Sequence, residues 1–148
     1  MSYSEESPLF IKLNYSDAQV PIMSYGNGNA GYDLFSYENG EVLPHETRLF
    51  DTGISFCPPP NTYGRIAPRS GVSKKKILIN AGVCDESYRG PIKIMIHNLS
   101  NTDNFIVNKG DRIAQLILER IATPPVVIVN ELTETERGDR GFGSSGKI

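Results

Sequence analysis

The sequence has no tryptophan and only two cysteines, Cys57 and Cys84, among its 148 residues. Neither cysteine has a second Cys or a His at metal-site spacing, so we expect two reduced thiols. No apolar run approaches the ~20 residues that a membrane-spanning helix needs. The first ten residues are polar and acidic, unlike a secretory signal. These absences predict a soluble, intracellular protein of the cytoplasm or nucleus, with no membrane partner.

A strong charge of either sign is also missing, since the net charge is −2. The longest cationic run, residues 74–76, is interpreted as a solvated surface. We therefore expect no nucleic-acid partner. The length is that of a single domain.

Turn-forming residues, by contrast, are abundant. The chain has 14 glycines and 10 prolines, more than the ordinary combined share of about 12%. They separate short apolar runs at steps of roughly ten residues, which is typical of an all-β sandwich or barrel. Asn39-Gly40 has the chemistry of a hairpin turn. Residues 10–13, 54–56 and 63–67 are expected to be strands, residues 30–36 alternate in the same way, and apolar runs occupy residues 77–79 and 92–96.

Two segments resist an all-β interpretation. Residues 70–76 are compatible with a short helix that has Ser70 as its N-cap. In residues 111–121, four isoleucines and leucines fall at helical spacing, so periodicity alone favours a second helix there.

A polar stretch, residues 80–90, lies between two of the apolar runs and has the chemistry of a hairpin. A carboxylate, a phenol and a guanidinium stand within five residues, at Asp85, Tyr88 and Arg89. A solvated turn explains these residues, and so does a hairpin that binds a planar ligand.

The C-terminal part changes character after Pro124-Pro125. Residues 126–129 are a strongly β-prone run with no guaranteed partner in the same chain. Residues 137–146 combine four glycines with two arginines and a phenylalanine. This composition fits either a disordered tail or a flexible lid that binds an anion.

Five segments in order resemble the motifs of the trimeric deoxyuridine triphosphatases (dUTPases), from about residue 30 to 146. They are Ala30-Gly31-Tyr32-Asp33-Leu34, Gly64-Arg65-Ile66-Ala67-Pro68-Arg69-Ser70-Gly71, residues 80–90, Gly110-Asp111-Arg112-Ile113-Ala114-Gln115-Leu116, and residues 137–146. The resemblance implies hydrolysis of dUTP to dUMP and pyrophosphate by water attack on the α-phosphorus, with Mg²⁺. It also implies that uracil is kept out of DNA and that dUMP is supplied for thymidylate synthesis.

The family fold implied is a distorted jelly-roll or β-barrel with one short helix, in which residues 111–121 form a strand. Residues 1–124 would form this domain. Residues 125–148 would form an exchanged strand and a glycine-rich arm that closes a neighbour's active site. The expected partners are therefore dUTP and two further copies in a homotrimer with shared sites. Burying residues 126–129 on a neighbour would also cover a sheet edge.

In the hairpin, the resemblance assigns Asp85 as the catalytic residue that positions and activates the water. Tyr88 would pack under the deoxyribose, where a 2′-hydroxyl has no space. The backbone of Gly82 and Val83 would read the uracil edge, and Lys93 occupies another base-contacting backbone position.

Phosphate contacts are implied for Arg69, Ser70, Gly71 and Gln115. Asp33 matches the acid associated with Mg²⁺ through water. In the tail, the expected substrate-binding residues are Arg137, Phe142, Gly143, Ser144 and Ser145. Asp111 and Arg112 are expected to hold neighbouring groups in place.

The chain departs from the family pattern at Cys84, often isoleucine, and at Ser87, usually Asp or Asn. Neither change removes a residue assigned to the chemistry. Two other interpretations stay open: a dCTP deaminase, whose fold is related, and a dUTPase-like interaction protein without activity. The first would lack the glycine-rich phenylalanine tail that is present here.

Overall fold

The computed structural model describes residues 7–143 and 146. Within these residues the chain forms eleven short strands and one four-residue helix. In chain order they are β1 (Phe10–Leu13), β2 (Tyr32–Phe35), β3 (Gly40–Val42), β4 (Thr47–Asp51), β5 (Ile54–Cys57), β6 (Thr62–Ala67), α1 (Ser70–Ser73), β7 (Ile77–Asn80), β8 (Val83–Cys84), β9 (Lys93–Asn98), β10 (Phe105–Val107) and β11 (Arg112–Arg120). No helix among them is long and apolar enough to cross a membrane.

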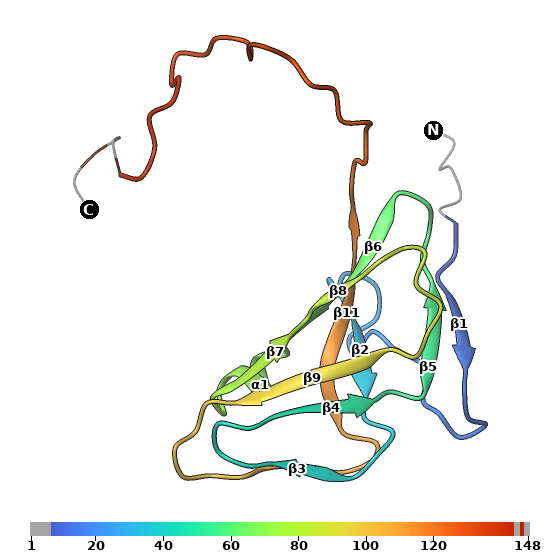
Figure 1. The fold of residues 1–148 in the computed structure, drawn as a ribbon. Helices are drawn as coiled ribbons and strands as arrows, with labels where there is room; N and C mark the ends of the chain where they lie inside the picture. The colour runs from blue at the N-terminus through green and yellow to red at the C-terminus, as the bar shows by residue number, and fades with distance from the viewer. Residues whose placement is uncertain (1–6, 144–145, 147–148) are drawn as a thin grey trace.

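The strands are arranged in four antiparallel sheets (Figure 1). The widest has the order β2-β11-β6-β8, and a second has the order β4-β9-β7. Two-stranded sheets pair β1 with β5 and β10 with β3. Most of these partners are distant in sequence, so the short strands gain their hydrogen bonds only when the whole body folds.

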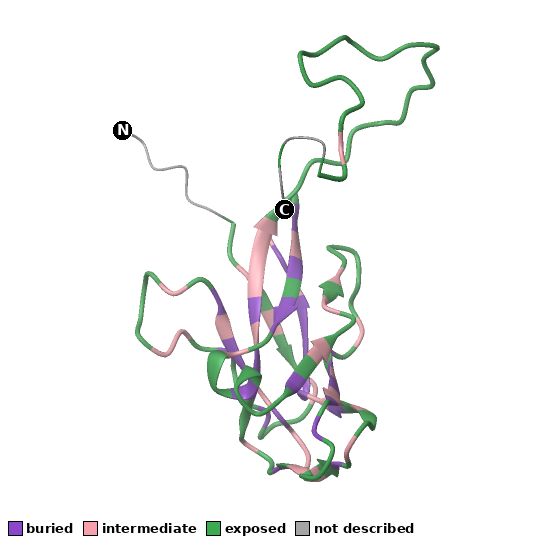
Figure 2. Cartoon of the chain, turned by 90° about the vertical axis from the view of Figure 1, so that its left-hand side faces the viewer, coloured by how far each residue is buried: buried purple, intermediate pink, exposed green. Residues whose placement is uncertain are grey.

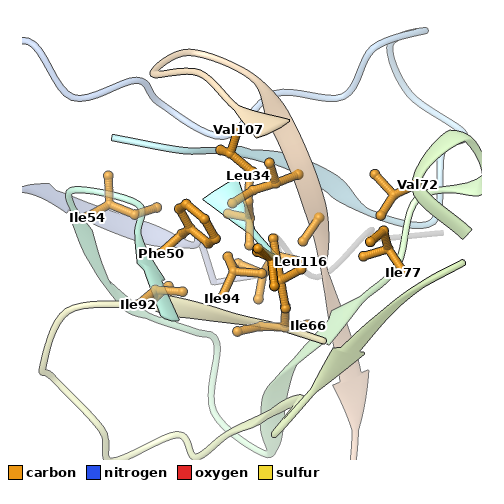
Figure 3. Close-up of a cluster of buried hydrophobic side chains, with 14 of the residues drawn as sticks. Leu34, Phe50, Ile54, Ile66, Val72, Ile77, Ile92, Ile94, Val107 and Leu116 are labelled. Carbon is orange, nitrogen blue, oxygen red and sulfur yellow. The ribbon is translucent and has the colours of Figure 1, made fainter. Parts of the chain in front are cut away.

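A single hydrophobic core lies between the two larger sheets (Figure 3). Leu34 and Leu116 enter it from the four-stranded sheet, and Phe50 and Ile94 from the three-stranded sheet. All four are fully buried. The predicted fold class, an all-β distorted jelly-roll with one short helix, is confirmed.

Strand β11 settles the ambiguity that periodicity created. Its pairing with β2 shifts register between Arg112 and Ala114, so the strand contains a bulge. The bulge lets two consecutive residues, Ile113 and Ala114, both be buried. The interrupted alternation explains why the apolar residues of a strand fall at helical spacing.

Two local predictions were wrong. Ser70 is the first residue of α1 and not its N-cap: Arg69 is the cap residue and makes no side-chain capping bond. Asn39-Gly40 does not join a hairpin, because β2 pairs with β11 and β3 pairs with β10. The Asn39 Oδ1 atom instead accepts a 2.8 Å hydrogen bond from the Lys109 N–H, which ties two loops together.

After β11 the chain leaves the body as the C-terminal extension, residues 121–143. It contains no strand or helix in the described chain, and it is exposed along nearly its whole length (Figures 1 and 2). Val126 and Ile128 are 94% and 95% exposed. Such an apolar run in water favours a partner surface. The division at residue 124 and the exchange of this segment between subunits stay predictions.

Candidate active site

Three strands bring chemically important residues into one row across the widest sheet. Asp33 of β2 pairs with Gln115 of β11, and Gln115 pairs on its other side with Ala67 of β6. The chain turns at Pro68 directly after this row. Arg69 follows the turn, and its guanidinium reaches back to Asp33.

The arginine cluster consists of Ser24, Asp33, Arg69 and Arg112. The Arg69 Nε atom donates to Asp33 Oδ1 over 3.0 Å, and Arg112 Nη1 lies 3.5 Å from Asp33 Oδ2. The Ser24 hydroxyl donates to the same Oδ2 atom and accepts a 3.0 Å bond from Arg112 Nη1. The Asp33 side chain is only 9% exposed. A buried carboxylate needs such partners, so this cluster fixes both arginines beside the turn.

The other residues expected at the phosphates lie next to this cluster. The Gln115 Nε2 atom donates to the Pro68 carbonyl over 3.0 Å, which places its amide beside Arg69. Ser70 and Gly71 begin α1 and are exposed. Arg69, Ser70, Gly71 and Gln115 are therefore brought together within one chain, as expected.

An open hollow of about 520 Å³ adjoins the cluster. Three cationic side chains line it, those of Arg69, Lys75 and Arg112, with the single carboxylate of Asp111. This excess of positive charge favours an anionic ligand. A larger hollow of about 740 Å³ lies at the other end of β11 beside Arg120, but it holds none of the predicted site residues.

The predicted hairpin is confirmed, because β7 and β9 pair antiparallel and residues 81–92 connect them. Within this connection β8 pairs with β6. The Ile66 N–H donates to the Gly82 carbonyl over 2.8 Å. A Cβ atom on Gly82 would lie 2.6 Å from the Ile66 carbonyl oxygen, so only glycine fits this approach.

Beyond β8, residues 85–90 form the hairpin tip, which holds Asp85 and Tyr88. The Tyr88 N–H donates to the Asp85 carbonyl over 3.0 Å, and the Tyr88 hydroxyl donates to the Pro91 carbonyl over 3.0 Å. A Cβ atom on Gly90 would lie 2.5 Å from the Tyr88 hydroxyl oxygen, so the ring lies directly against the backbone. Tyr88 is 45% exposed. The Asp85 carboxylate is exposed and makes no hydrogen bond or ion pair to any described residue.

The remaining predicted residues of the hairpin are exposed. Val83 and Lys93 are both accessible at the surface. Cys84 is half-buried, and burial together with the neighbouring Asp85 charge raises the pKa of its thiol. The thiol is therefore protonated at neutral pH and is a poor nucleophile.

The C-terminal extension stands apart from the hairpin tip and from the elements that carry the arginine cluster (Figure 1). Arg137 Nε donates to the Arg140 carbonyl over 2.7 Å, so its bonds are local. Phe142 is fully exposed, and Gly143 follows it in a left-handed conformation at φ 89°. Ser144 and Ser145 lie outside the described residues. In the described chain, no hydrogen bond or ion pair joins the extension, the hairpin tip and the arginine cluster to one another.

A protein-family model described as dUTPase matches residues 17–146. The chain belongs to the dUTPase family. The deoxyuridine 5′-triphosphate nucleotidohydrolase of Paramecium bursaria Chlorella virus 1 is 49% identical over 142 residues, covering 95% of this chain and 99% of the relative. The Arabidopsis thaliana enzyme of the same name is 46% identical over 144 residues, covering 97% and 86%. The predicted family and the prediction of a hydrolase are thus confirmed.

Solved structures of dUTPases share the fold. A mutant dUTPase of Staphylococcus bacteriophage 80alpha with dUpNHpp matches with a TM-score of 0.87 at 31% identity, covering 95% of this chain and 99% of that one. A mutant dUTPase of phage phi11 of S. aureus matches with a TM-score of 0.80 at 27% identity, covering 86% and 100%. The latter structure is described as revealing the coordination of a structural Mg(II) ion.

The residues of this dUTPase-family chain fit Mg²⁺ only in one way. The described residues contain no group of three or more His, Cys, Asp or Glu that could hold a metal alone. Magnesium keeps several waters and readily takes its other ligands from substrate phosphates. A carboxylate has about four acceptor sites, and three donor groups approach Asp33. Most acceptor sites of Asp33 are therefore already occupied, which fits an ion that arrives with phosphates and reaches Asp33 through water.

Sequence reasoning missed Ser24. It lies in the loop before β2 and bridges Asp33 to Arg112, which is 88 positions away along the chain. A lone serine in a polar loop carries no pattern that separates it from any other turn residue. Arg112, which was expected to hold neighbouring groups in place, contacts Ser24 and Asp33.

Proposed function

We propose that this chain hydrolyses dUTP to dUMP and pyrophosphate. A water oxygen bonds to the α-phosphorus, and the bond from that phosphorus to the β-bridging oxygen breaks. The water proton passes to the Asp85 carboxylate, and pyrophosphate leaves. The observation that carries this proposal is the hairpin tip: the Asp85 carboxylate is exposed with no partner among the described residues, yet the turn around it is fixed by Tyr88. A general base of this kind contributes about 10²–10⁴-fold to the rate.

Base and sugar selection would come from the same hairpin. The backbone at Gly82 and Val83 lies where strands β8 and β6 meet, and it would pair with the uracil edge. The Tyr88 ring is held against the Gly90 backbone, so it has no room to retreat from a 2′-hydroxyl. A ribonucleotide would then bury an unpaired hydroxyl, which costs free energy. Lys93 would contribute through its backbone only.

The polyphosphate would bind beside the arginine cluster. Arg69, Ser70, Gly71 and Gln115 would donate to phosphate oxygens. Asp33 would hold the arginines in place and contact a water of the bound metal. When bound, Mg²⁺ would neutralise charge on the phosphates and on the leaving pyrophosphate.

We further propose a homotrimer in which each site is shared. Support comes from the exposed apolar run, residues 126–129, and from the absence of bonds joining the extension, tip and arginine cluster in the described chain. The extension would pair with a neighbour, and Arg137, Phe142, Gly143, Ser144 and Ser145 would close over the nucleotide. The biological role of the enzyme would be to keep uracil out of DNA and to supply dUMP for thymidylate synthesis inside the cell.

The first experiment is pyrophosphate release from dUTP, dCTP, dTTP and UTP, with Mg²⁺ and then with EDTA. We expect metal-dependent release from dUTP alone. Release of ammonia from dCTP would indicate a deaminase. No reaction with any nucleotide, with dUTP still bound, would indicate an interaction module.

A second experiment tests the base. Asp85→Asn should lower kcat for dUTP by at least about 10²-fold and leave nucleotide affinity nearly unchanged. Glu86→Gln is the matched control, since Glu86 is the neighbouring exposed carboxylate of the tip. Turnover that survives in Asp85→Asn, or falls equally in Glu86→Gln, contradicts the assignment.

A further inference from the structure

The hollow beside the arginine cluster contains a cation that the proposed mechanism does not use. Lys75 lines the hollow together with Arg69 and Arg112. It lies in the short connection between the end of α1 at Ser73 and the start of β7 at Ile77. The resemblance to the dUTPases implies no role for this side chain.

The three cationic side chains differ in the hydrogen bonds and ion pairs that they already make within the described chain. Arg69 donates to Asp33 and to the Arg112 carbonyl, and Arg112 contacts Asp33 and Ser24. The Lys75 side chain is exposed and makes no hydrogen bond or ion pair to any described residue. Its ammonium is therefore the one cation lining this hollow whose charge is not already paired in the described chain.

The backbone beneath Lys75 is nevertheless fixed. The Lys75 N–H donates to the Val72 carbonyl over 3.0 Å, and Val72 is buried. The next residue, Lys76, adopts φ 60°, and its carbonyl accepts a 2.9 Å bond from the Leu99 N–H. An exposed ammonium is thus carried by a backbone that hydrogen bonds hold in place. This arrangement suits an anion that arrives from solvent, because three rotatable donors can adapt to it.

We propose that Lys75 binds the polyphosphate of the substrate as an additional phosphate-contacting residue, alongside the turn at Arg69. The proposal rests on the proposed function, since it names the ligand of this hollow as the phosphate chain of dUTP. Paired with phosphate in both ground and transition states, Lys75 would lower KM more than it raises kcat.

The neighbouring lysines provide matched controls. All three lysines line a second hollow, of about 290 Å³, that also includes Asp103. Among the three, Lys75 alone also lines the hollow of the arginine cluster. Lys74 has the same charge, is one residue away and is also exposed, but it does not line the hollow of the arginine cluster.

The test compares Lys75→Gln, Lys75→Arg and Lys74→Gln in steady-state hydrolysis of dUTP, after thermal unfolding has shown equal stability. We expect Lys75→Gln to raise KM by about three- to tenfold with kcat within about twofold, as for loss of one charge contact at a surface. The inhibition constant of added pyrophosphate should rise in parallel, and the effect should shrink at high salt. Lys75→Arg and Lys74→Gln should stay close to the unchanged protein.

Equal effects of Lys75→Gln and Lys74→Gln, no change in KM, or no rescue by arginine would overturn the proposal. If the unchanged protein does not hydrolyse dUTP, the proposed function fails by itself. Calorimetry with inorganic pyrophosphate then decides separately on Lys75: weaker binding in Lys75→Gln alone supports the site, and equal binding refutes it.

Discussion

Replacing Gly82 with alanine tests how closely the hairpin must approach the central sheet. The new Cβ atom would lie 2.6 Å from the Ile66 carbonyl oxygen, whereas contacts below 3.0 Å are essentially never seen. Strand β6 lies between β11 and β8, so the Ile66 carbonyl cannot easily move. The hairpin must therefore shift by at least 0.4 Å, the difference between those distances, and the 2.8 Å bond from the Ile66 N–H to the Gly82 carbonyl is disturbed.

Overpacking of this kind costs about 1–3 kcal/mol, and loss of one backbone hydrogen bond costs about 0.5–1.5 kcal/mol. The two effects have the same cause, so we expect a total loss of about 1–3 kcal/mol in the free energy of unfolding, measured by urea denaturation. KM for dUTP should rise as well, because the displaced backbone is the proposed uracil contact. Gly71→Ala is the control for the unfolding measurement alone, since a Cβ atom at Gly71 meets nothing within 4 Å but Gly71 is itself a proposed phosphate contact. An unfolding free energy for Gly82→Ala within about 0.5 kcal/mol of the unchanged protein, the range of ordinary surface substitutions, would refute the close approach.

Three further outcomes follow from other contacts. Arg69→Ala should destabilise the protein by about 1–3 kcal/mol, less than the usual 3–5 kcal/mol for breaking a buried pair, because other donors to Asp33 remain. Additive losses for Arg69→Ala and Asp33→Asn in a double-mutant cycle would contradict an interaction between the two side chains. Lys76→Asn should raise the melting temperature, since asparagine tolerates the φ of 60° better than lysine does; an unchanged or lower value would contradict this. The Lys109 ammonium lowers the pKa of Asp17 from 3.8 to about 2, so the stability that Asp17 contributes is complete above pH 3.8 and disappears as the pH falls toward 2. Asp17→Asn should therefore lower stability at pH 5 and much less at pH 2, and an equal loss at both would contradict the linkage.

The sequence predicted the fold where local chemistry and tertiary structure agree. Alternating or continuous apolar runs bounded by Gly and Pro became strands, and the stretch from residue 80 to 90 became a hairpin connection. The prediction failed where local chemistry has more than one use. Asn39-Gly40 carries a turn signature, yet the Asn39 amide side chain binds the Lys109 backbone 70 positions away. Turn propensity does not report which strand will be the partner.

The site was predictable to different depths for similar reasons. The motifs located Asp33, Arg69 and Gln115, because each belongs to a segment with a recognisable order of residues. Their mutual contacts were not predictable, since they depend on the register of β11 against both β2 and β6. Ser24 and Lys75 carry no local signal, and only the folded chain reveals that they lie beside the same two arginines.

If the site is shared between subunits as proposed, folding of one chain and completion of the site are separate events. The arginine cluster and the hairpin tip are each held by their own hydrogen bonds. Strand β6 pairs with β8 next to the tip and leads through Pro68 to Arg69 of the cluster. The extension, in contrast, leaves Val126 and Ile128 almost fully exposed. Burying such a side chain stabilises a structure by about 1.5–3 kcal/mol. In a single chain these side chains stay in water, whereas a neighbouring chain could bury them. In the proposed trimer, association would be driven by the apolar run, and it would bring Arg137 and Phe142 to a site whose other parts already make their hydrogen bonds within one chain.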